Sequence, residues 1–475
     1  MRFIKPVIVA LGLTTAIVAP AFAQDATAKN VILLITDGAG METWNAASYY
    51  RHGALGHEAY DDFDVKVFAN TIPLNISLEP TKSDADKVTF DEPTLWGKEP
   101  VDTVFEGAIG NYPGFFSGYD YARADYTDSA AAGTALSTGH KTYNNAIGWS
   151  NDDAQLKNIG EFTVESGRAL GVISTVQWTH ATPAAFLAHN RSRNEYAALA
   201  QEIVNTGAAT VVMGAGHPYF DEAGVAVAEP DEKAFRYVGG KETWDKLKAG
   251  ETAYKLIETK ADFDSLAEGN LDLGGKKLIG TVENNLTTQF NRPGVGMGDK
   301  LANSPDLSTM TKGALNVLSQ NDKGFFLMVE GGAVDWAAHA NNLPRLIEEQ
   351  LDFNDAVETA VEWVEENSSW DDTLVIVTTD HGNGLLLGPN SDEKAYQPII
   401  SQGAGALPLV RWNTDTHTRE LVPVYAKGAG ADYFTEAAQP APGLAAYGVA
   451  EESQVFVDNT DVFKAAMGAF GLKAE

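Results

Sequence analysis

The sequence contains no cysteine and is poor in positive charge. Without cysteine the chain has no disulfide, no thiolate ligand for zinc and no thiol nucleophile. Its 34 Lys and Arg residues stand against 65 Asp and Glu, which gives a formal net charge of −31. We therefore expect no surface for nucleic acid or anionic lipid, because both require positive charge. Any metal must be held by His, Asp, Glu or hydroxyl groups.

Long apolar runs are also scarce, and the most apolar stretch lies at the N-terminus. A positively charged start precedes a mostly apolar segment over 7–18, and the small residues Ala21 and Ala23 suit a cleavage site. This pattern predicts a signal peptide over 1–23. An uncleaved membrane anchor is the alternative, but a membrane span needs about 20 apolar residues. We expect a periplasmic or secreted protein that is free of the membrane after cleavage.

Short apolar runs alternate with helical patterns through the remaining residues, 24–475. Six runs have the length and composition of buried parallel strands, at 31–36, 170–176, 210–213, 325–329, 374–379 and 421–425. Apolar residues at helical spacing predict a helix over 346–364. This alternation predicts a single α/β domain whose central, mostly parallel sheet is covered by helices on both faces. Polar stretches at about 60–126 and 229–299 are expected as surface insertions on that sheet.

Acidic residues directly follow two of the predicted strands. Asp37 comes after the strand at 31–36, and Asp380 and His381 come after the strand at 374–379. Because ligand sites in open α/β sheets lie beyond the carboxyl ends of the strands, we expect these residues at one edge. A turn or capping role is the alternative for each aspartate.

Asp335 and His339 stand four residues apart, a spacing that places both side chains on one face of a helix. They follow the predicted strand at 325–329 and the acidic turn at Glu330, and a hydroxyl-rich loop near the end of the chain carries His417. An ordinary surface pair is the alternative for Asp335 and His339. A set of carboxylates and imidazoles without cysteine suits zinc with a neighbouring magnesium.

Ser129 stands at the start of an alanine-rich helical pattern, at or near its N-cap. Capping alone would explain it. The functional alternative is that the helix N-terminus stabilises a serine alkoxide and a bound phosphate, which requires the metal ligands to lie close by. Arg193 follows the Thr-His-Ala-Thr-Pro-Ala-Ala segment and could clamp a phosphate with two parallel hydrogen bonds, or could simply be solvated.

In their order along the chain, these motifs resemble those of the alkaline phosphatase family. The resemblance rests on the Asp-Gly after the first strand, Asp-Ser-Ala-Ala-Ala-Gly-Thr, Thr-Pro-Ala-Ala followed by His and Arg, Val-Glu-Gly-Gly followed by Asp and His, Thr-Asp-His-Gly, and a late Thr-His. It covers nearly all of 24–475. It implies an alkaline-phosphatase-like α/β fold and a phosphoric monoester hydrolase that acts on small phosphate monoesters through a phosphoserine, as a homodimer.

The resemblance also implies two Zn²⁺ and one Mg²⁺ per subunit, with a role for each motif residue. Asp335, His339 and His417 would hold the first zinc, Asp37, Asp380 and His381 the second, and Asp37, Thr182 and Glu330 the magnesium. Ser129 would be the nucleophile, and Arg193 would bind the phosphate oxygens that are not transferred.

Two positions depart from the best-known bacterial form of that family. His180 and Trp336 stand beside the site where that form has Asp and Lys, and such replacements resemble those in certain marine and animal members. We expect them to alter magnesium binding and to weaken the binding of product phosphate.

Two other functions stay open from the sequence. One is a phosphodiesterase or sulfatase of the same superfamily, and the other is an exported metal-binding or phosphate-binding protein without turnover. Thr182 together with Glu330 favours the monoesterase over the first, and Ser129 favours catalysis over the second.

Overall fold

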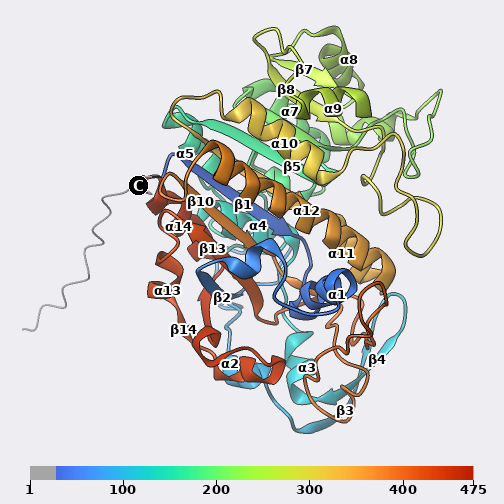
Figure 1. Ribbon diagram of the computed structural model, residues 1–475, viewed down its shortest axis with the longest axis vertical. Coiled ribbons are helices and arrows are strands. Elements are labelled where there is room, and N and C mark those ends of the chain that lie inside the picture. Colours follow the sequence, from blue (N-terminus) through green and yellow to red (C-terminus); the bar gives the residue numbers. More distant parts are fainter. Residues whose placement is uncertain (1–27, 474–475) are drawn as a thin grey trace, which may run out of the picture.

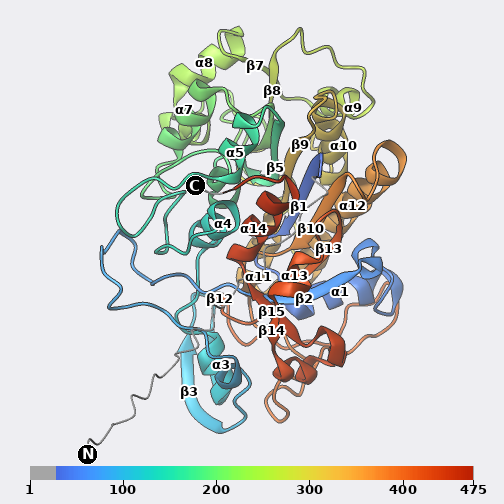
Figure 2. The same ribbon diagram turned by 90° about the vertical axis from the view of Figure 1, so that its left-hand side faces the viewer.

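The computed structural model describes residues 28–473, so the predicted signal peptide at 1–23 lies outside the described residues. Within 28–473, eleven strands form one central sheet in the order β14-β15-β2-β13-β10-β1-β9-β5-β6-β8-β7 (Figures 1 and 2). These strands are β1 (Asn30–Thr36), β2 (Val65–Asn70), β5 (Ala169–Gln177), β6 (Val211–Ala215), β7 (Tyr254–Ile257), β8 (Lys277–Thr281), β9 (Phe325–Gly331), β10 (Thr373–Thr378), β13 (Val422–Gly428), β14 (Gln439–Pro440) and β15 (Val455–Asp458).

β1 lies at the centre of the sheet, and all seven of its residues are buried. It runs parallel to β10 on one side and to β9 on the other, and parallel pairing continues from β9 through β5, β6 and β8 to β7. The predicted mostly parallel sheet is thus confirmed. For the predicted strand at 421–425 the expected parallel direction is wrong, because β13 runs antiparallel to both of its neighbours, β10 and β2.

Helices cover both faces of the sheet. Successive side chains of a strand point to opposite faces, so a strand that is apolar throughout needs a covering layer on each side. In β1, Val31, Leu33 and Ile35 pack in one apolar cluster, whereas Ile32 and Leu34 pack in the other. The first cluster includes residues of α4 (Ser129–Thr138), α5 (Ile159–Glu165), α6 (Ala181–Ala185), α7 (Tyr196–Thr206), α8 (Lys241–Ala249), α13 (Tyr433–Ala437) and α14 (Thr460–Ala469). The second includes residues of α1 (Met41–His52), α9 (Lys260–Ala267), α10 (Leu307–Leu318), α11 (Ala333–His339) and α12 (Leu343–Asn367), and α12 contains the helix predicted over 346–364.

The two stretches predicted as surface insertions on the sheet are in part members of it, which corrects that expectation. β2 lies within 60–126 and pairs with β13 and β15, and β7 and β8 within 229–299 form the far edge beyond β6. These strands are short and flanked by polar sequence, so their apolar runs are weak local signals. Their membership in the sheet depends on pairing with distant strands.

Part of 60–126 does lie outside the central sheet. β3 (Pro100–Glu106) and β4 (Asn111–Phe116) form a separate two-stranded hairpin, with α3 (Ser117–Ala122) beside it (Figures 1 and 2) and α2 (Glu92–Leu95) packed against α3. Another small sheet joins β11 (Gly382–Asn383) to β12 (His417–Thr418). In the described part of the chain, none of the helices combines the length and the apolar character needed to cross a membrane.

Candidate active site

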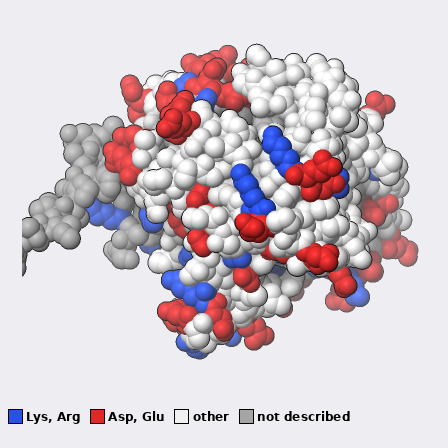
Figure 3. Space-filling model, turned by 90° about the horizontal axis from the view of Figure 1, so that it is seen from below, with Lys and Arg blue, Asp and Glu red and all other residues white. Residues whose placement is uncertain are grey.

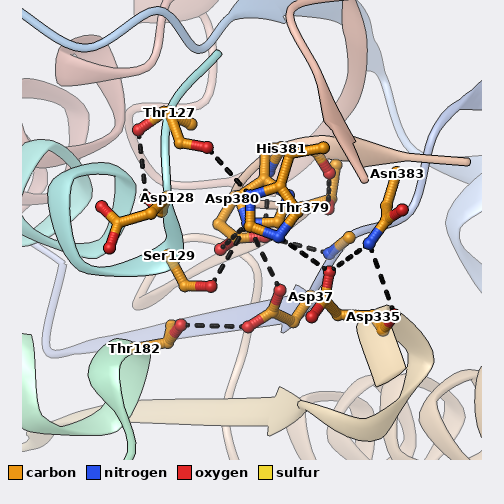
Figure 4. A network of polar contacts seen from close by, with 12 residues as sticks. Asp37, Thr127, Asp128, Ser129, Thr182, Asp335, Thr379, Asp380, His381 and Asn383 are labelled. Atoms are coloured by element: carbon orange, nitrogen blue, oxygen red, sulfur yellow. Dashed lines mark hydrogen bonds and ion pairs between the residues drawn. The ribbon is translucent and has the colours of Figure 1, made fainter. Parts of the chain in front are cut away.

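Three predicted residues meet where β1 and β10 end side by side. Asp37 directly follows β1, and Asp380 and His381 come just after β10, so parallel pairing brings them to the same edge. His381 Nε2 lies 3.1 Å from Asp380 Oδ2 and 3.6 Å from Asp37 Oδ1 (Figure 4). The backbone N–H of Gly38 donates a hydrogen bond to the other Asp380 oxygen, at 3.1 Å. All three side chains are completely buried.

A second group forms beside the first from α11 and β12. His339 Nε2 lies 3.3 Å from Asp335 Oδ2, and His417 Nε2 lies 3.3 Å from Asp335 Oδ1. The two imidazole Nε2 atoms are 3.1 Å apart. The His417 ring also stacks on the His381 ring, with 3.7 Å between centroids, so the two groups share a wall.

Hydrogen bonds to backbone carbonyls orient the imidazoles of the second group. His339 Nδ1 lies 2.7 Å from the carbonyl oxygen of Asp415, and His417 Nδ1 lies 2.9 Å from that of Thr127. Because a carbonyl only accepts, Nδ1 carries the proton and a neutral ring has its lone pair on Nε2. When both rings are neutral, as metal binding requires, the two Nε2 lone pairs face each other across 3.1 Å and do not bond to one another. This is the arrangement of metal-binding histidines whose second nitrogen is held by the protein.

The carboxylates also fit a metal. Asp37 Oδ1 and Asp380 Oδ2 are buried and have no hydrogen-bond partner among the described residues. Burial, with the neighbouring carboxylates, raises the pKa of Asp37 well above its ordinary value and that of Asp380 to about 7. Burial alone would raise the pKa of Asp335 too, but His339 and His417 outweigh it and hold it well below its ordinary value. Such a concentration of buried acids is stabilised by bound cations.

A third group lies on the other side of Asp37. Thr182, in α6, donates a hydrogen bond of 3.2 Å to Asp37 Oδ2, and Ser174 of β5 donates one to Glu330 Oε2. Glu330 Oε1 is buried and has no partner among the described residues. Asp37, Glu330 and His180 each place one possible ligand atom within 4.8 Å of the others. His180, predicted only to stand beside this site, thus lies close enough to take part in it.

His180 is held as a neutral ring by its surroundings. Burial lowers its pKa to about 3, and the nearby Arg193 guanidinium adds to the effect. Its Nε2 accepts a hydrogen bond of 3.2 Å from Arg193 Nη2, since arginine has only donors. Trp336 packs edge-on against the ring, with centroids 6.1 Å apart.

Ser129 is the first residue of α4, and the N-cap is Asp128. The Ser129 hydroxyl oxygen lies 3.2 Å from His381 Nε2, at the boundary of the metal-binding groups (Figure 4). Small side chains follow it, and Gly133 packs so close to α6 that an added Cβ would lie 3.2 Å from Ala185. Because Ser129 is the first residue of α4, the free backbone N–H groups of the helix N-terminus point at the region beside the serine, where an anion is favoured.

Asp128 is a site residue that the sequence-based prediction missed. One carboxylate oxygen accepts hydrogen bonds of 3.0 Å from the backbone N–H groups of Ala131 and Asn145. The other accepts one of 3.0 Å from Arg193 Nη1, so Asp128 caps the serine helix and orients the arginine. An aspartate directly before the serine of a helix start was the available signal. Asn383 was also missed, and no such signal marked it; its Nδ2 donates a hydrogen bond of 2.7 Å to Asp335 Oδ1.

These groups open into a cavity of about 740 Å³. Seven predicted residues line it, namely Ser129, His180, Arg193, Asp335, Trp336, His339 and His417. The other five, Asp37, Thr182, Glu330, Asp380 and His381, are buried and are linked to it by the contacts above. The structure thus brings all twelve predicted residues into one site.

The sequence profile of the alkaline phosphatase family matches residues 111–404, more than half of the chain. The chain belongs to the alkaline phosphatase family. It is 34% identical to alkaline phosphatase 4 of Bacillus subtilis over 283 residues, 58% of this chain, and 31% identical to alkaline phosphatase 3 of the same organism over 362 residues, 75% of this chain. The matches span 54% and 61% of the lengths of these two relatives.

Solved structures of the family agree with the fold. The alkaline phosphatase of the Antarctic bacterium TAB5 superposes with a TM-score of 0.61 at 25% identity, covering 94% of this chain and 99% of that one. Family members use metal ions, and among the described residues three sets of side chains have possible ligand atoms within 4.8 Å of one another, namely Asp335 with His381 and His417, Asp37 with His180 and Glu330, and Asp37 with Asp380 and His381.

Proposed function

We propose that this protein hydrolyses phosphate monoesters to an alcohol and inorganic phosphate through a phosphoserine on Ser129. The observation that carries the proposal is the Ser129 hydroxyl at the N-terminus of α4, 3.2 Å from His381 Nε2. A serine needs activation to act as a nucleophile, and the converging imidazole and carboxylate groups beside it provide a place for cations. Family membership supports the same chemistry.

We further propose two Zn²⁺ and one Mg²⁺ per subunit. Asp335, His339 and His417 would hold one zinc, Asp37, Asp380 and His381 the other, and Asp37, Thr182 and Glu330 the magnesium. When bound, these cations would supply positive charge for the phosphate oxygens and lower the pKa of the serine hydroxyl.

The residues of the chain then divide the reaction into two displacements. Ser129 Oγ forms a bond to phosphorus as the ester P–O bond breaks, and the alcohol leaves with a proton. Water next attacks the phosphoserine, which restores the serine hydroxyl and releases phosphate. Throughout, Arg193 donates hydrogen bonds to nonbridging oxygens of the phosphoryl group, in an orientation that Asp128 and His180 hold before substrate arrives.

The charge of the protein makes Arg193 important for substrate entry. Figure 3 shows acidic side chains in several clusters over one face, with fewer basic ones among them, in keeping with the net charge of −31. Among the described residues that line the cavity, Arg193 is the one Lys or Arg. A dianionic ester therefore depends on this guanidinium, the α4 N-terminus and the cations for attraction into the site.

The proposal is tested by hydrolysis of p-nitrophenyl phosphate at alkaline pH, with bis(p-nitrophenyl) phosphate as the diester control. We expect monoester turnover that is lost on chelation, returns with zinc and magnesium, and is abolished in Ser129→Ala. Acid quenching during turnover should leave one phosphoryl group on the peptide that contains Ser129. Turnover of the diester alone, or full activity in Ser129→Ala, would refute the proposal.

We also propose that the protein is exported, with cleavage after Ala23, and that it forms a homodimer. Intact mass spectrometry of protein from the periplasm or medium should show a chain that begins at Gln24. Sedimentation analysis should give twice the mass of one chain. A chain that retains 1–23 or sediments as a monomer would contradict the respective statement.

A further inference from the structure

The β3–β4 hairpin, which lies outside the central sheet, reaches the mouth of the proposed active site. Its connecting turn is formed by residues 107–110, and Ala108 and Ile109 in that turn line the same cavity as Ser129. Ile109 is 58% exposed, and Val104 on the same hairpin is 59% exposed but does not line the cavity. The turn therefore places an apolar side chain at the entrance.

Asp415 fixes this turn to the site. Its Oδ2 atom accepts a hydrogen bond of 2.6 Å from the backbone N–H of Ile109. Gly107 approaches so closely that an added Cβ would lie 2.1 Å from Asp415 Oδ1, so the turn accepts no side chain there. The backbone carbonyl of Asp415 is also the acceptor for His339 Nδ1. One buried residue thus orients an imidazole of the second metal-binding group and positions the apolar turn above it.

Further contacts along β4 make the hairpin a fixed wall. The Tyr112 hydroxyl donates a hydrogen bond of 2.7 Å to Asn341 Oδ1, and Asn341 Nδ2 donates one of 3.0 Å to the Thr414 carbonyl. Arg123 Nη1 donates to the carbonyls of Pro113, at 3.2 Å, and Asn413, at 3.1 Å. The hairpin is therefore attached both to the segment after α11 and to the loop that carries Asp415.

Apolar side chains from α11 and its surroundings complete the mouth. Trp336 and Ala340 directly follow Asp335 and His339 in sequence, so they stand next to the metal-binding groups. The Phe290 ring packs edge-on against Trp336, with centroids 6.4 Å apart. These side chains line the same cavity as Ser129 and Arg193, so they are within reach of the organic part of an ester whose phosphate lies between those two residues.

We propose that this apolar mouth, made of Ala108, Ile109, Phe290, Trp336 and Ala340, binds the organic part of the substrate. The protein then selects phosphate monoesters with extended alkyl or aromatic groups over those with compact polar ones. This inference rests on the proposed monoesterase function. It follows because removing apolar surface from water favours binding in proportion to the area buried, and no cationic side chain of the described mouth offers a partner to a second anionic group.

A series of straight-chain alkyl phosphates isolates this effect. Ethyl, butyl and hexyl phosphate have leaving alcohols of similar acidity, so the chemical step stays nearly constant while apolar area grows. Each fully buried methylene corresponds to about a fourfold gain, because its transfer from water is worth about 0.8 kcal/mol. For a partly open mouth we expect kcat/KM to rise about tenfold or more from ethyl to hexyl phosphate.

Two variants of the hairpin test whether the turn causes the gain. Ile109→Asp should remove most of the rise with chain length, because it places a charge where the alkyl group would lie. Val104→Asp adds the same charge to an equally exposed position outside the cavity, and it should keep the rise seen in the wild type. Equal slopes for wild type and Ile109→Asp would overturn the assignment of the turn.

Equilibrium binding provides a second readout that does not depend on turnover. Calorimetry of the metal-loaded protein with ethylphosphonate and hexylphosphonate should give a lower Kd and a more negative heat-capacity change for hexylphosphonate, the signature of apolar burial. Equal values for the two ligands would overturn the inference. Hydrolysis of p-nitrophenyl phosphate with a flat chain-length dependence would overturn it too, while leaving the monoesterase function in place. Failure to hydrolyse any monoester would instead refute the proposed function, on which the inference rests.

Discussion

Glu42 makes the stability of this protein depend on pH in a direction that can be calculated. Its side chain is 1% exposed near the start of α1, where Oε2 accepts a hydrogen bond of 3.1 Å from Asn45 and Oε1 has no partner among the described residues. Burial raises its pKa from 4.5 to about 8. The folded protein therefore keeps a proton that the unfolded chain releases, and the free energy of unfolding falls as pH rises from 4.5 to 8.

The magnitude follows from the shift. Each pKa unit corresponds to about 1.36 kcal/mol. The raised pKa of Glu42 therefore lowers the free energy of unfolding by roughly 4–5 kcal/mol above pH 8, but by under about 1 kcal/mol at pH 5. Gln is the neutral isostere of the protonated side chain. We expect Glu42→Gln to gain roughly 4 kcal/mol of stability relative to the wild type between pH 5 and pH 9.

Urea unfolding at pH 5 and pH 9, with the same metal content in both proteins, measures this difference directly. Glu358→Gln is the matched control, because it makes the same change of side chain at an exposed position on α12. A relative gain below about 1 kcal/mol for Glu42→Gln would refute the reasoning, as would an equal gain in the control.

Three further predictions concern the site. Asp128→Asn keeps an oxygen that can cap α4 but loses the charge that holds Arg193, so kcat/KM for p-nitrophenyl phosphate should fall about 10- to 100-fold with little change in Tm. A normal rate would contradict the positioning role of Asp128. Chelation should lower Tm by several degrees, because it leaves the buried Asp37 and Asp380 carboxylates without a cation, and added zinc should restore the original Tm. An unchanged melting curve would argue against metal at these residues. Trp336→Lys should tighten inhibition by product phosphate, since it adds a cation at the cavity, and an unchanged inhibition constant would show that this position does not set phosphate affinity.

The sequence by itself determined the local elements and the residue types of the site. Apolar runs marked six strands of the central sheet, and the i, i+4 spacing of Asp335 and His339 placed both on one helix face. Asp37 and Asp380 were predicted at one sheet edge because they directly follow strands. These features depend on periodicity and on neighbours in sequence, so local physical chemistry is sufficient for them.

Tertiary structure alone decided which strands pair, and in which direction. β13 was expected to be parallel and is antiparallel, and β2, β7 and β8 belong to the central sheet although their surroundings are polar. Strand direction depends on the path of the connection between strands, and pairing depends on partners far away in sequence. Neither is written in the residues of the strand itself.

The same distinction applies within the site. Arg193 is oriented by Asp128 across 65 positions, and His339 is oriented by the carbonyl of Asp415 across 76 positions. The Asp415 carboxylate also accepts the N–H of Ile109 across 306 positions, which brings the hairpin turn to the mouth. Every residue has a backbone carbonyl, and every residue except proline has a backbone N–H. No residue type therefore marks in advance which backbone group the fold will bring to a functional side chain.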